Sequence, residues 1–320
     1  MVKRLCLFAG YSKNNIIEDY VVYYIKELSL FADVYYCADC NINEFELNKL
    51  SNYVKKSIAY RHKKYDFGSW AILLSHINNI NEYDEILLIN DSVYGPLFPL
   101  KDIFEKMKDK EVSAWSVCGN LFMMSFFIVL KREVFLASWF KDFMDNIKND
   151  LEKNDIVRLY EKGLSKIIEQ HNLKWDCAFS SQNLKAQIKE KRYFIQNGLK
   201  NIPLKTRICH RFRFNKIRLY DDDYFALLLL GFPFIKKQAF GFYSNNFNLL
   251  APIFIKKYSH YDYNLIANSL EINNITQNHL SLRTKIIKNL KNFIFEKKYK
   301  GKGIVYKIFK IKIYTKKHSI

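Results

Sequence analysis

The sequence predicts an α/β protein with a doubly wound, mostly parallel sheet, and three observations support this fold class. Apolar strand-like segments alternate with amphipathic helical segments through the first hundred residues. Ile86–Ile89 is apolar at four consecutive positions, which is typical of a short strand buried on both faces. Small polar residues follow this segment at once, as expected at the end of such a strand.

The early elements are justified by their hydrophobic periodicity. The segment Ile16–Leu28 places six apolar or aromatic side chains on one helical face, namely Ile17, Tyr20, Val21, Tyr24, Ile25 and Leu28. In chain order, we expect strand Arg4–Ala9, polar loop Gly10–Asn15, helix Ile16–Leu28, strand Ala32–Ala38, helix Ser69–Ile80 and strand Ile86–Ile89.

The later elements are predicted in the same way. Phe122–Leu130 indicates a buried strand whose aromatic residues are mostly core. A helix over Asp155–Gln170 directs its apolar residues inward, namely Ile156, Leu159, Leu164, Ile167 and Ile168. A further helix over Tyr224–Leu230 follows three acids, Asp221–Asp223, which are better read as an N-terminal charge cap than as a metal cluster.

Composition narrows the class of protein. At 320 residues and 49% hydrophobic content, the chain is long enough for a substantial core, which excludes general disorder. The longest apolar runs, Leu121–Leu130 and Tyr224–Ile235, are shorter than the roughly 20 residues that cross a bilayer. The N-terminus predicts a strand rather than a signal peptide. We therefore expect a cytoplasmic protein or one peripheral to the cytoplasmic membrane.

Sequence motifs disfavour several other functions. No G-x-G-x-x-G follows the first strand and no P-loop motif occurs, which disfavours dinucleotide-binding and P-loop enzymes. The six cysteines are scattered, and the single C-x-x-C pair, Cys37 and Cys40, has no second pair to complete a zinc site. We expect reduced, buried thiols.

The net charge of +19 is concentrated at the C-terminus. From Arg283 to Lys317 there are thirteen Lys or Arg residues and one acid, Glu296. Residues 285–295 fit a basic amphipathic helix, which can bind an anionic membrane surface at about 1 kcal/mol per basic residue. Nucleic acid would be attracted by the same charge. A solvated basic helix and strand, packed on the domain, is the alternative.

The most informative segment is Asn90–Asp91–Ser92, directly after the predicted strand Ile86–Ile89. Ligands of open α/β sheets bind beyond the carboxyl ends of the strands. A carboxylate at Asp91 can hold a divalent ion or a ribose hydroxyl there. Alternatively, Asp91 and Ser92 only shape a turn or cap the next helix.

Five short motifs, taken together, resemble those of the rhamnan synthesis F family. They occur in the family's order over residues 3 to about 270, which is most of the chain; each is weak alone, and the ordered set is fairly specific. The motifs are Tyr65–Gly68, Asn90–Pro96, Ser125–Phe127 with Lys131–Val134, Tyr160–Ser165 and Gly231–Lys237.

The resemblance implies a fold and a function. It implies a GT-A-like nucleotide-sugar glycosyltransferase domain over residues 1–245 and a helical, basic extension over residues 246–320. The expected reaction moves a sugar, with rhamnose as one candidate, from a nucleotide-sugar donor to a growing rhamnan, capsule or O-antigen. A lipid-linked glycan acceptor at the inner membrane face fits the basic tail. The alternatives are a catalytically inactive scaffold and a nucleic-acid-binding protein.

The resemblance also implies how the donor diphosphate is bound. Asp91 takes the position at which GT-A enzymes hold Mg²⁺ or Mn²⁺ against the diphosphate. This chain has one carboxylate where a D-x-D motif has two, so Arg61, Lys63 or Lys64 is an alternative source of positive charge.

The remaining donor contacts lie at strand ends. Gly10, Tyr11 and Ser12 are expected beside the base and ribose, and Asn90 and Ser92 flank Asp91. Asp66 is expected to contact the nucleoside or the donor sugar, or else to cap the helix predicted from Ser69. Arg61–Lys64 replaces an Asn and a Gly that family members often have there, so donor contacts can differ.

Glu161 is the candidate general base. Inverting transfer needs a carboxylate to take the acceptor proton on the face opposite the leaving group. Glu161 lies in a Tyr-Glu-x-Gly-Leu-Ser pattern like the family's, although it can equally be a surface helix residue. Phe122–Met124 stands where many members have His and Gln, which implies a more apolar acceptor subsite or lost activity.

Overall fold

The computed structural model describes residues 2–119, 121–180, 224–240, 247–275, 295–300, 303–308 and 311–315. It divides into two compact units, Met1–Ile275 and Thr276–Ile320. Helices α13 (Phe247–Tyr258) and α14 (Asn264–Ile272), which the sequence assigned to the C-terminal extension, therefore belong to the first unit. The division of function at residue 245 stays a prediction.

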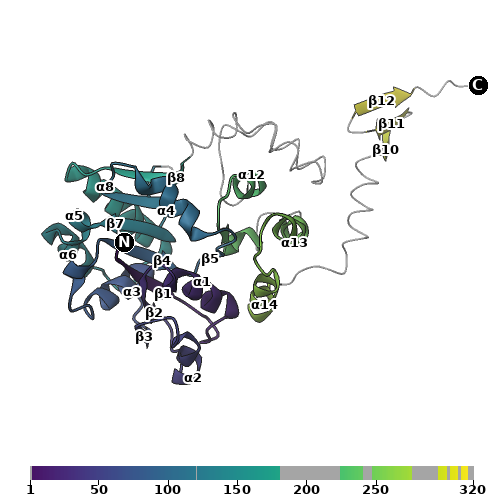
Figure 1. The fold of residues 1–320 in the computed structure, drawn as a ribbon. Helices are drawn as coiled ribbons and strands as arrows, with labels where there is room; N and C mark the ends of the chain where they lie inside the picture. Colours follow the sequence, from purple (N-terminus) through teal and green to yellow (C-terminus); the bar gives the residue numbers. More distant parts are fainter. Residues whose placement is uncertain are drawn as a thin grey trace, which may run out of the picture. The chain divides into compact units, whose positions relative to one another are not determined.

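The first unit is organised around a seven-stranded sheet with the order β3-β2-β1-β4-β7-β6-β8 (Figure 1). All neighbouring pairs are parallel except the two made by β7, which runs antiparallel to β4 and β6. This confirms the predicted α/β class with a mostly parallel sheet. The strands are β1 (Arg4–Gly10), β2 (Asp33–Ala38), β3 (Lys56–Ala59), β4 (Glu85–Asn90), β6 (Ala114–Gly119), β7 (Phe127–Lys131) and β8 (Trp175–Ser180).

Helices pack on both faces of this sheet. In β4, Ile86 and Leu88 enter one core cluster, whereas Leu87 and Ile89 enter the other, and all four side chains are fully buried. The strand predicted from four apolar residues is thus covered on both faces. The helices are α1 (Asp19–Ser29), α2 (Glu44–Leu47), α3 (Tyr65–Leu74), α4 (Leu100–Lys108), α5 (Arg132–Phe135), α6 (Ser138–Asp145), α7 (Lys153–Ile156), α8 (Lys162–Gln170) and α12 (Tyr224–Leu229).

A small antiparallel ribbon brings a distant segment to the end of β4. Strand β5 (Val93–Tyr94) pairs with β9 (Ile235–Lys236), and the register places Val93 opposite Lys236. The backbone N–H of Lys237 donates to the carbonyl of Ser92 at 3.1 Å, which extends the ribbon by one bond. Two consecutive lysines are therefore held directly beside the Asn90–Asp91–Ser92 segment.

Helix α3 departs from its prediction at both ends. It spans Tyr65–Leu74 rather than Ser69–Ile80, so Asp66 lies in its first turn and is not its N-cap. Gly68 precedes the predicted helix but lies inside the observed one. A Cβ atom there would lie 2.1 Å from the Cβ of Lys64, so the close approach of the preceding turn requires glycine.

The helix predicted over Asp155–Gln170 is divided by a π-helical turn, Val157–Glu161, between α7 and α8. An extra residue in a turn shifts the phase of the helix. As a result Leu159, predicted to face inward, is 37% exposed, while Tyr160 is buried. Likewise, β7 begins at Phe127 rather than Phe122, because the preceding residues form a loop.

The second unit contains a three-stranded antiparallel sheet. Its strands are β10 (Phe295–Lys300), β11 (Gly303–Ile308) and β12 (Ile311–Thr315). The alternating basic and apolar residues of 304–308 and 311–314 thus lie in strands. The basic helix predicted over 285–295 lies outside the described residues, apart from Phe295 in β10.

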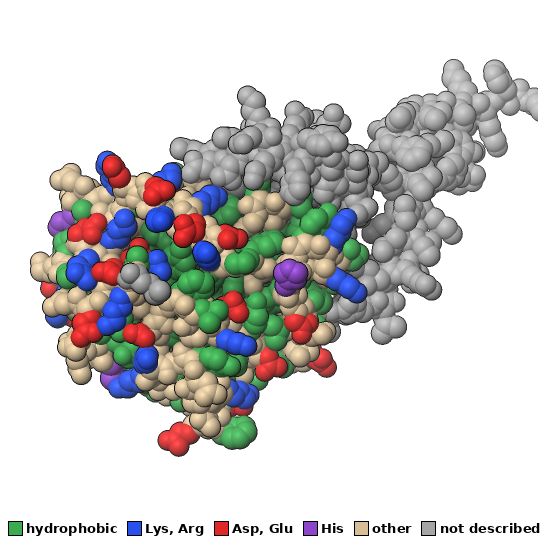
Figure 2. Space-filling model, viewed as in Figure 1, with side chains coloured by type: hydrophobic (Ala, Val, Ile, Leu, Met, Phe, Trp, Pro, Cys, Tyr) green, Lys and Arg blue, Asp and Glu red, His purple; other side chains and the backbone are tan. Residues whose placement is uncertain are grey.

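The surface and the cysteines agree with a globular protein. Within the described ranges, the five cysteines are buried and form no disulfide. No helix among those residues is long and apolar enough to cross a bilayer. On the face drawn in Figure 2, basic and acidic side chains are interspersed over the coloured part of the surface.

Candidate functional site

The site lies where the carboxyl ends of β1, β2 and β4 meet at one edge of the sheet. The backbone N–H of Asp91 donates to the carbonyl of Ala9 at 3.2 Å. The backbone N–H of Tyr11 in turn donates to Asp91 Oδ2 at 3.1 Å. The structure therefore brings together Tyr11 and Asp91, two of the residues predicted to contact the donor.

Asn90 is the centre of a hydrogen-bond network at this edge. Its side-chain N–H₂ donates to Asp66 Oδ2 at 2.7 Å and to the carbonyl of Ser125 at 3.4 Å. Its Oδ1 accepts from both the backbone N–H and the hydroxyl of Ser92, at 3.1 and 2.7 Å. Asn90 is 6% exposed, so these bonds satisfy an amide that is shielded from water.

Glu161 joins this network through Ser125. The Ser125 hydroxyl donates to Glu161 Oε1 in a short hydrogen bond. Burial raises the pKa of Glu161 above 4.5, the Ser125 bond opposes this rise, and the negative charge of Asp66 adds to it. Burial likewise raises the pKa of Asp66, although the bond from Asn90 opposes the shift. Two half-buried carboxylates with raised pKa values thus belong to one hydrogen-bond network.

Lys236 supplies positive charge to this hydrogen-bond network through Ser92. Its Nζ donates to the Ser92 hydroxyl at 3.1 Å and lies 4.4 Å from the centre of the Phe126 ring. Burial lowers the pKa of Lys236 to about 8, while the charges of Glu161 and Asp66 oppose that change. Lys236 lies in the Gly231–Lys237 motif, but the sequence alone indicated no role for it.

Lys237 lies directly after β9 and contacts Asp91 and Tyr20. Its Nζ lies 3.9 Å from Asp91 Oδ2 and donates a short hydrogen bond to the Tyr20 hydroxyl. That hydroxyl donates to the backbone carbonyl of Asp91 at 3.2 Å. The two adjacent lysines after an apolar segment were the available signal: Lys236 ends β9, and Lys237 begins the 3₁₀ turn that follows it.

Asp39, at the end of β2, holds the loop that precedes α3. Its Oδ1 accepts from the backbone N–H groups of His62 and Lys63 at 2.9 and 2.8 Å. Its Oδ2 accepts from the N–H of Tyr65 at 3.1 Å and contacts Arg61 Nη1 at 2.9 Å. The sequence identified Asp39 only as the end of a strand.

The side chains of Arg61 and Lys63, two of the three cations predicted to bind the diphosphate, have other partners. The Arg61 guanidinium is bonded to Asp39 and lies 5.8 Å from the centre of the Tyr11 ring. Lys63 pairs with Asp150 at 3.2 Å. The backbone N–H of Lys64 donates to His62 Nδ1 at 3.2 Å, and its side chain is half-buried next to Gly68. None of these three cations pairs with Asp91 among the described contacts, whereas Lys237 does.

Gly10 and Ser12 have structural roles in the described contacts. Gly10 is buried, and a Cβ atom there would lie 2.2 Å from the Tyr36 hydroxyl oxygen. The Ser12 hydroxyl accepts from the backbone N–H groups of Asn14 and Ile16, both at 3.3 Å. Their predicted contacts with the donor stay predictions, whereas Tyr11 is 52% exposed at this edge.

The predicted acceptor subsite and acidic cluster are placed only in part. Met123, one of the residues that replace the family's His and Gln, is fully buried in the core. Phe122 is half-buried, with the Lys162 ammonium 5.6 Å from its ring centre. Asp221–Asp223 lie outside the described residues.

The residues around Asp91 do not fit a divalent metal. Mg²⁺ and Mn²⁺ need several oxygen ligands, but Asp91 contributes one carboxylate and already accepts from Tyr11. The oxygen of the Asn90 side chain is bonded to Ser92, and the Lys237 ammonium lies beside Asp91. Over the described ranges, no group of three His, Cys, Asp or Glu side chains is arranged to hold a metal. The prediction of Asp91 as a metal ligand is therefore not supported by its surroundings.

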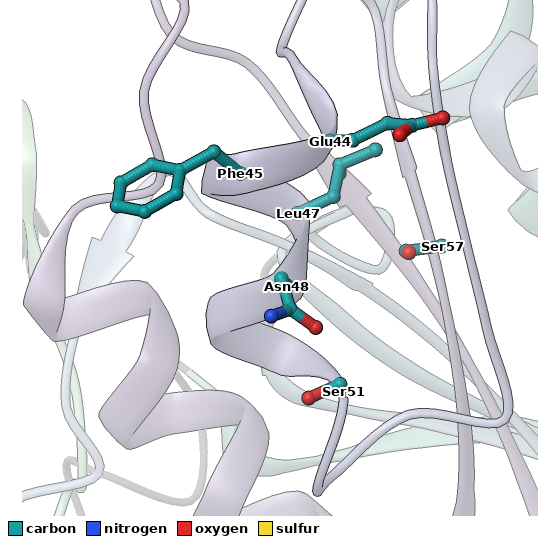
Figure 3. Close-up of a pocket in the computed structure, with 6 residues that line it drawn as sticks. All are labelled: Glu44, Phe45, Leu47, Asn48, Ser51 and Ser57. Carbon is teal, nitrogen blue, oxygen red and sulfur yellow. The ribbon is translucent and has the colours of Figure 1, made fainter.

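A separate surface pocket lies near the outer edge of the sheet (Figure 3). It is lined by residues of α2, the turn that follows it and β3, namely Glu44, Phe45, Leu47, Asn48, Ser51 and Ser57. These side chains include none of the residues of the network around Asn90.

The fold and the site define a class: an α/β protein with paired carboxylates and lysines at the carboxyl edge of a mixed sheet. A family model described as rhamnan synthesis protein F matches residues 34–309, and the chain belongs to this family. This confirms the resemblance identified from the five motifs. No protein of curated function matches the chain.

Solved structures show weaker likeness. A protein described as a nucleotide-diphospho-sugar transferase from Desulfovibrio desulfuricans is 13% identical, with 64% of this chain and 91% of that chain covered and a TM-score of 0.32. Core-mannan synthase A from Aspergillus fumigatus, in a Mn/GDP form, is 9% identical, with coverages of 45% and 63% and a TM-score of 0.28. Residues 1–349 of TarS from S. aureus are 10% identical, with coverages of 98% and 98% and a TM-score of 0.31.

Proposed function

We propose that the chain is a nucleotide-sugar glycosyltransferase that extends a cell-surface polysaccharide, with Glu161 as its general base. The family supports the polysaccharide, because its members are described by rhamnan synthesis. The observation that carries the base assignment is the half-buried carboxylate of Glu161, bonded to Ser125, whose pKa is raised by burial. A base is most effective when its pKa approaches the working pH.

The reaction needs one proton transfer and one displacement. The acceptor hydroxyl oxygen bonds to the anomeric carbon while the bond from that carbon to the diphosphate oxygen breaks. The hydroxyl proton passes to Glu161, and the electron pair of the broken bond leaves with the nucleoside diphosphate. Attack opposite the leaving group inverts the anomeric centre, as in inverting glycoside hydrolysis.

Ser125 orients the base. Its hydroxyl donates to one carboxylate oxygen of Glu161, so the second oxygen can receive the proton. The Ser125 carbonyl also accepts from Asn90, which connects the base to the end of β4. Asn90 in turn fixes Asp66 and Ser92, and we assign these side chains to the pocket of the donor sugar.

The nucleoside is assigned to the ends of β1 and β3. The exposed Tyr11 ring and the nearby Arg61 guanidinium offer a stacking surface for a base. The backbone of Gly10 and Ser12 lies in the same loop, and Asp91 fixes this loop through the Tyr11 N–H. A ribose or diphosphate bound beside Asp91 would therefore meet the loop and Lys237 together.

The proposed function also suggests an acceptor and a cellular location for the protein. We infer that rhamnose is one candidate sugar and that the product is rhamnan, capsule or O-antigen. A lipid-linked acceptor at the inner face of the cytoplasmic membrane would present its glycan to the site. The basic residues 283–317 would then contact the anionic lipid surface.

The test is a transfer assay with dTDP, UDP, GDP and CMP sugars. Release of one nucleoside diphosphate on addition of a polysaccharide acceptor is the expected result, together with thermal stabilisation by that nucleotide. Stabilisation without turnover would indicate the inactive scaffold. A salt-sensitive gel shift with nucleic acid, and no effect of any sugar nucleotide, would instead favour nucleic-acid binding.

A further inference from the structure

The ribbon of β5 and β9 positions two lysines for two different tasks. Lys236 donates to Ser92, Ser92 is bonded to Asn90, and Asn90 is bonded to Asp66, so the hydrogen-bond network connects Lys236 to an acid. Lys237 lies against Asp91 and Tyr20 at the end of β4. The charge of Lys236 thus belongs to the network of the acids, whereas that of Lys237 lies at the predicted position of the donor diphosphate.

Lys237 is held in place but not enclosed. Its side chain is 26% exposed and that of Asp91 is 15% exposed. The Tyr20 hydroxyl bonds to both the Lys237 ammonium and the Asp91 carbonyl, so all three groups are oriented by one another. An ammonium has three N–H donors, so Lys237 retains capacity for an incoming phosphate oxygen.

The same geometry disfavours a divalent ion at this position. A metal bound to Asp91 would be repelled by the Lys237 ammonium, which lies 3.9 Å from the carboxylate oxygen. The side-chain oxygens of Asn90 and Ser92 are occupied by one another and by Lys236. A fixed ammonium therefore stands where the family resemblance implies a metal.

We propose that the Lys237 ammonium, oriented by Asp91 and Tyr20, binds the donor diphosphate in place of a divalent cation, so that donor binding and transfer require no metal. The inference rests on the proposed function, because it assigns the diphosphate subsite of that reaction. As the bond from the anomeric carbon to the diphosphate breaks, the leaving oxygen gains the electron pair. Lys237 stabilises that charge by a charge-assisted hydrogen bond.

The experiment measures binding of UDP, GDP and dTDP to the full chain by calorimetry. Each nucleotide is titrated in EDTA, in Mg²⁺ and in Mn²⁺, at low ionic strength. The variants are Lys237→Met, which keeps the length of the side chain, and Lys237→Arg, which keeps the charge. Lys101→Met, on the exposed side of α4, is the control for loss of one positive charge. Circular dichroism and thermal midpoints establish that each variant is folded.

We expect one nucleotide to bind the wild-type chain equally well in EDTA and in metal. Lys237→Met should raise its Kd by at least about tenfold, the value of one charge-assisted bond. Lys237→Arg should recover most of the affinity, and Lys101→Met should bind like wild type. If Lys237→Met does not fold, two measurements still decide. Wild type must bind the nucleotide in EDTA, and Lys237→Arg must keep most of that affinity.

Two results would overturn the proposal in different ways. Binding that appears only with Mg²⁺ or Mn²⁺ would refute the role of Lys237 while supporting a nucleotide site. Binding that is equal in Lys237→Met and wild type would place the diphosphate elsewhere. If no nucleotide binds under any condition, the proposed function itself fails.

Discussion

Two acids at the same edge of the sheet, Asp39 and Glu161, have contrasting surroundings. Asp39 accepts three backbone N–H bonds and pairs with Arg61, so both of its oxygens are bonded to donors. Glu161 has one bond, from Ser125, and lies near the negative charge of Asp66. The first side chain is fully engaged in holding a loop, whereas burial raises the pKa of the second.

The contrast separates a structural acid from a candidate catalytic one. Asp39 holds the loop of residues 61–65 in place and so positions the first turn of α3. Glu161 lies in a π-helical turn, an irregularity often found at functional sites. Removing each acid should therefore affect different properties of the protein.

The largest effect is expected from Glu161→Gln. Loss of the base should lower the transfer rate by about 10²–10⁴-fold. Donor affinity and the thermal midpoint should be unchanged or slightly raised, because the variant removes a half-buried charge. Rate assays, calorimetry and thermal melts measure these quantities, with Glu133→Gln on the exposed side of α5 as the control. Full activity in Glu161→Gln would remove the base assignment.

A large effect of a different kind is expected from Asp39→Ala. The variant leaves three backbone donors and the Arg61 guanidinium without their shared acceptor, at a cost of about 3 kcal/mol in the free energy of unfolding. Denaturant unfolding measures this loss, and the exposed Asp109→Ala should change stability by less than about 0.5 kcal/mol. A stable but inactive Asp39→Ala would show that the two acids do not differ as the structure indicates.

The pH dependence should distinguish the two environments further. Glu161 must be ionised to act as a base, so the transfer rate should fall as pH decreases through its raised pKa. Between its ordinary value of 4.5 and that raised pKa, the folded chain binds more protons at this group than the unfolded chain. Stability from this group therefore decreases as pH rises through that window, and Glu161→Gln should remove the decrease. A rate that is constant across the window would contradict the assignment.

The smallest effect is expected from Asp66→Asn. The variant keeps an oxygen that can accept from Asn90, but it removes a negative charge that raises the pKa of Glu161. The acid limb of the pH–rate profile should move to lower pH, by less than the whole shift because burial is the main cause. An unmoved limb would show that Asp66 and Glu161 do not interact.

Local sequence patterns predicted much of the fold. The four apolar residues Ile86–Ile89 alone predicted a strand buried on both faces, because such a strand needs no polar side. These local patterns predicted the bounds and the phase of some helices incorrectly. The helix predicted from Ser69 begins at Tyr65, so Gly68 lies inside α3, where a Cβ atom would lie 2.1 Å from the Cβ of Lys64. The π-helical turn shifted the helical phase and exposed Leu159, which a regular period of 3.6 residues cannot anticipate.

The sequence by itself determined the fold class, the end of β4 to within one residue (Ile89 predicted, Asn90 observed) and the family. These depend on short-range periodicity and on motifs that can be read along the chain. Only the tertiary structure decided which charges meet there: Lys236 contacts Ser92 from 144 residues away, and Glu161 contacts Ser125 from 36 residues away. The reason is that β5 pairs with β9 and that the turn of Glu161 packs beside the loop before β7. Such long-range contacts place the Lys237 ammonium beside Asp91, the residue at which the sequence predicted a metal.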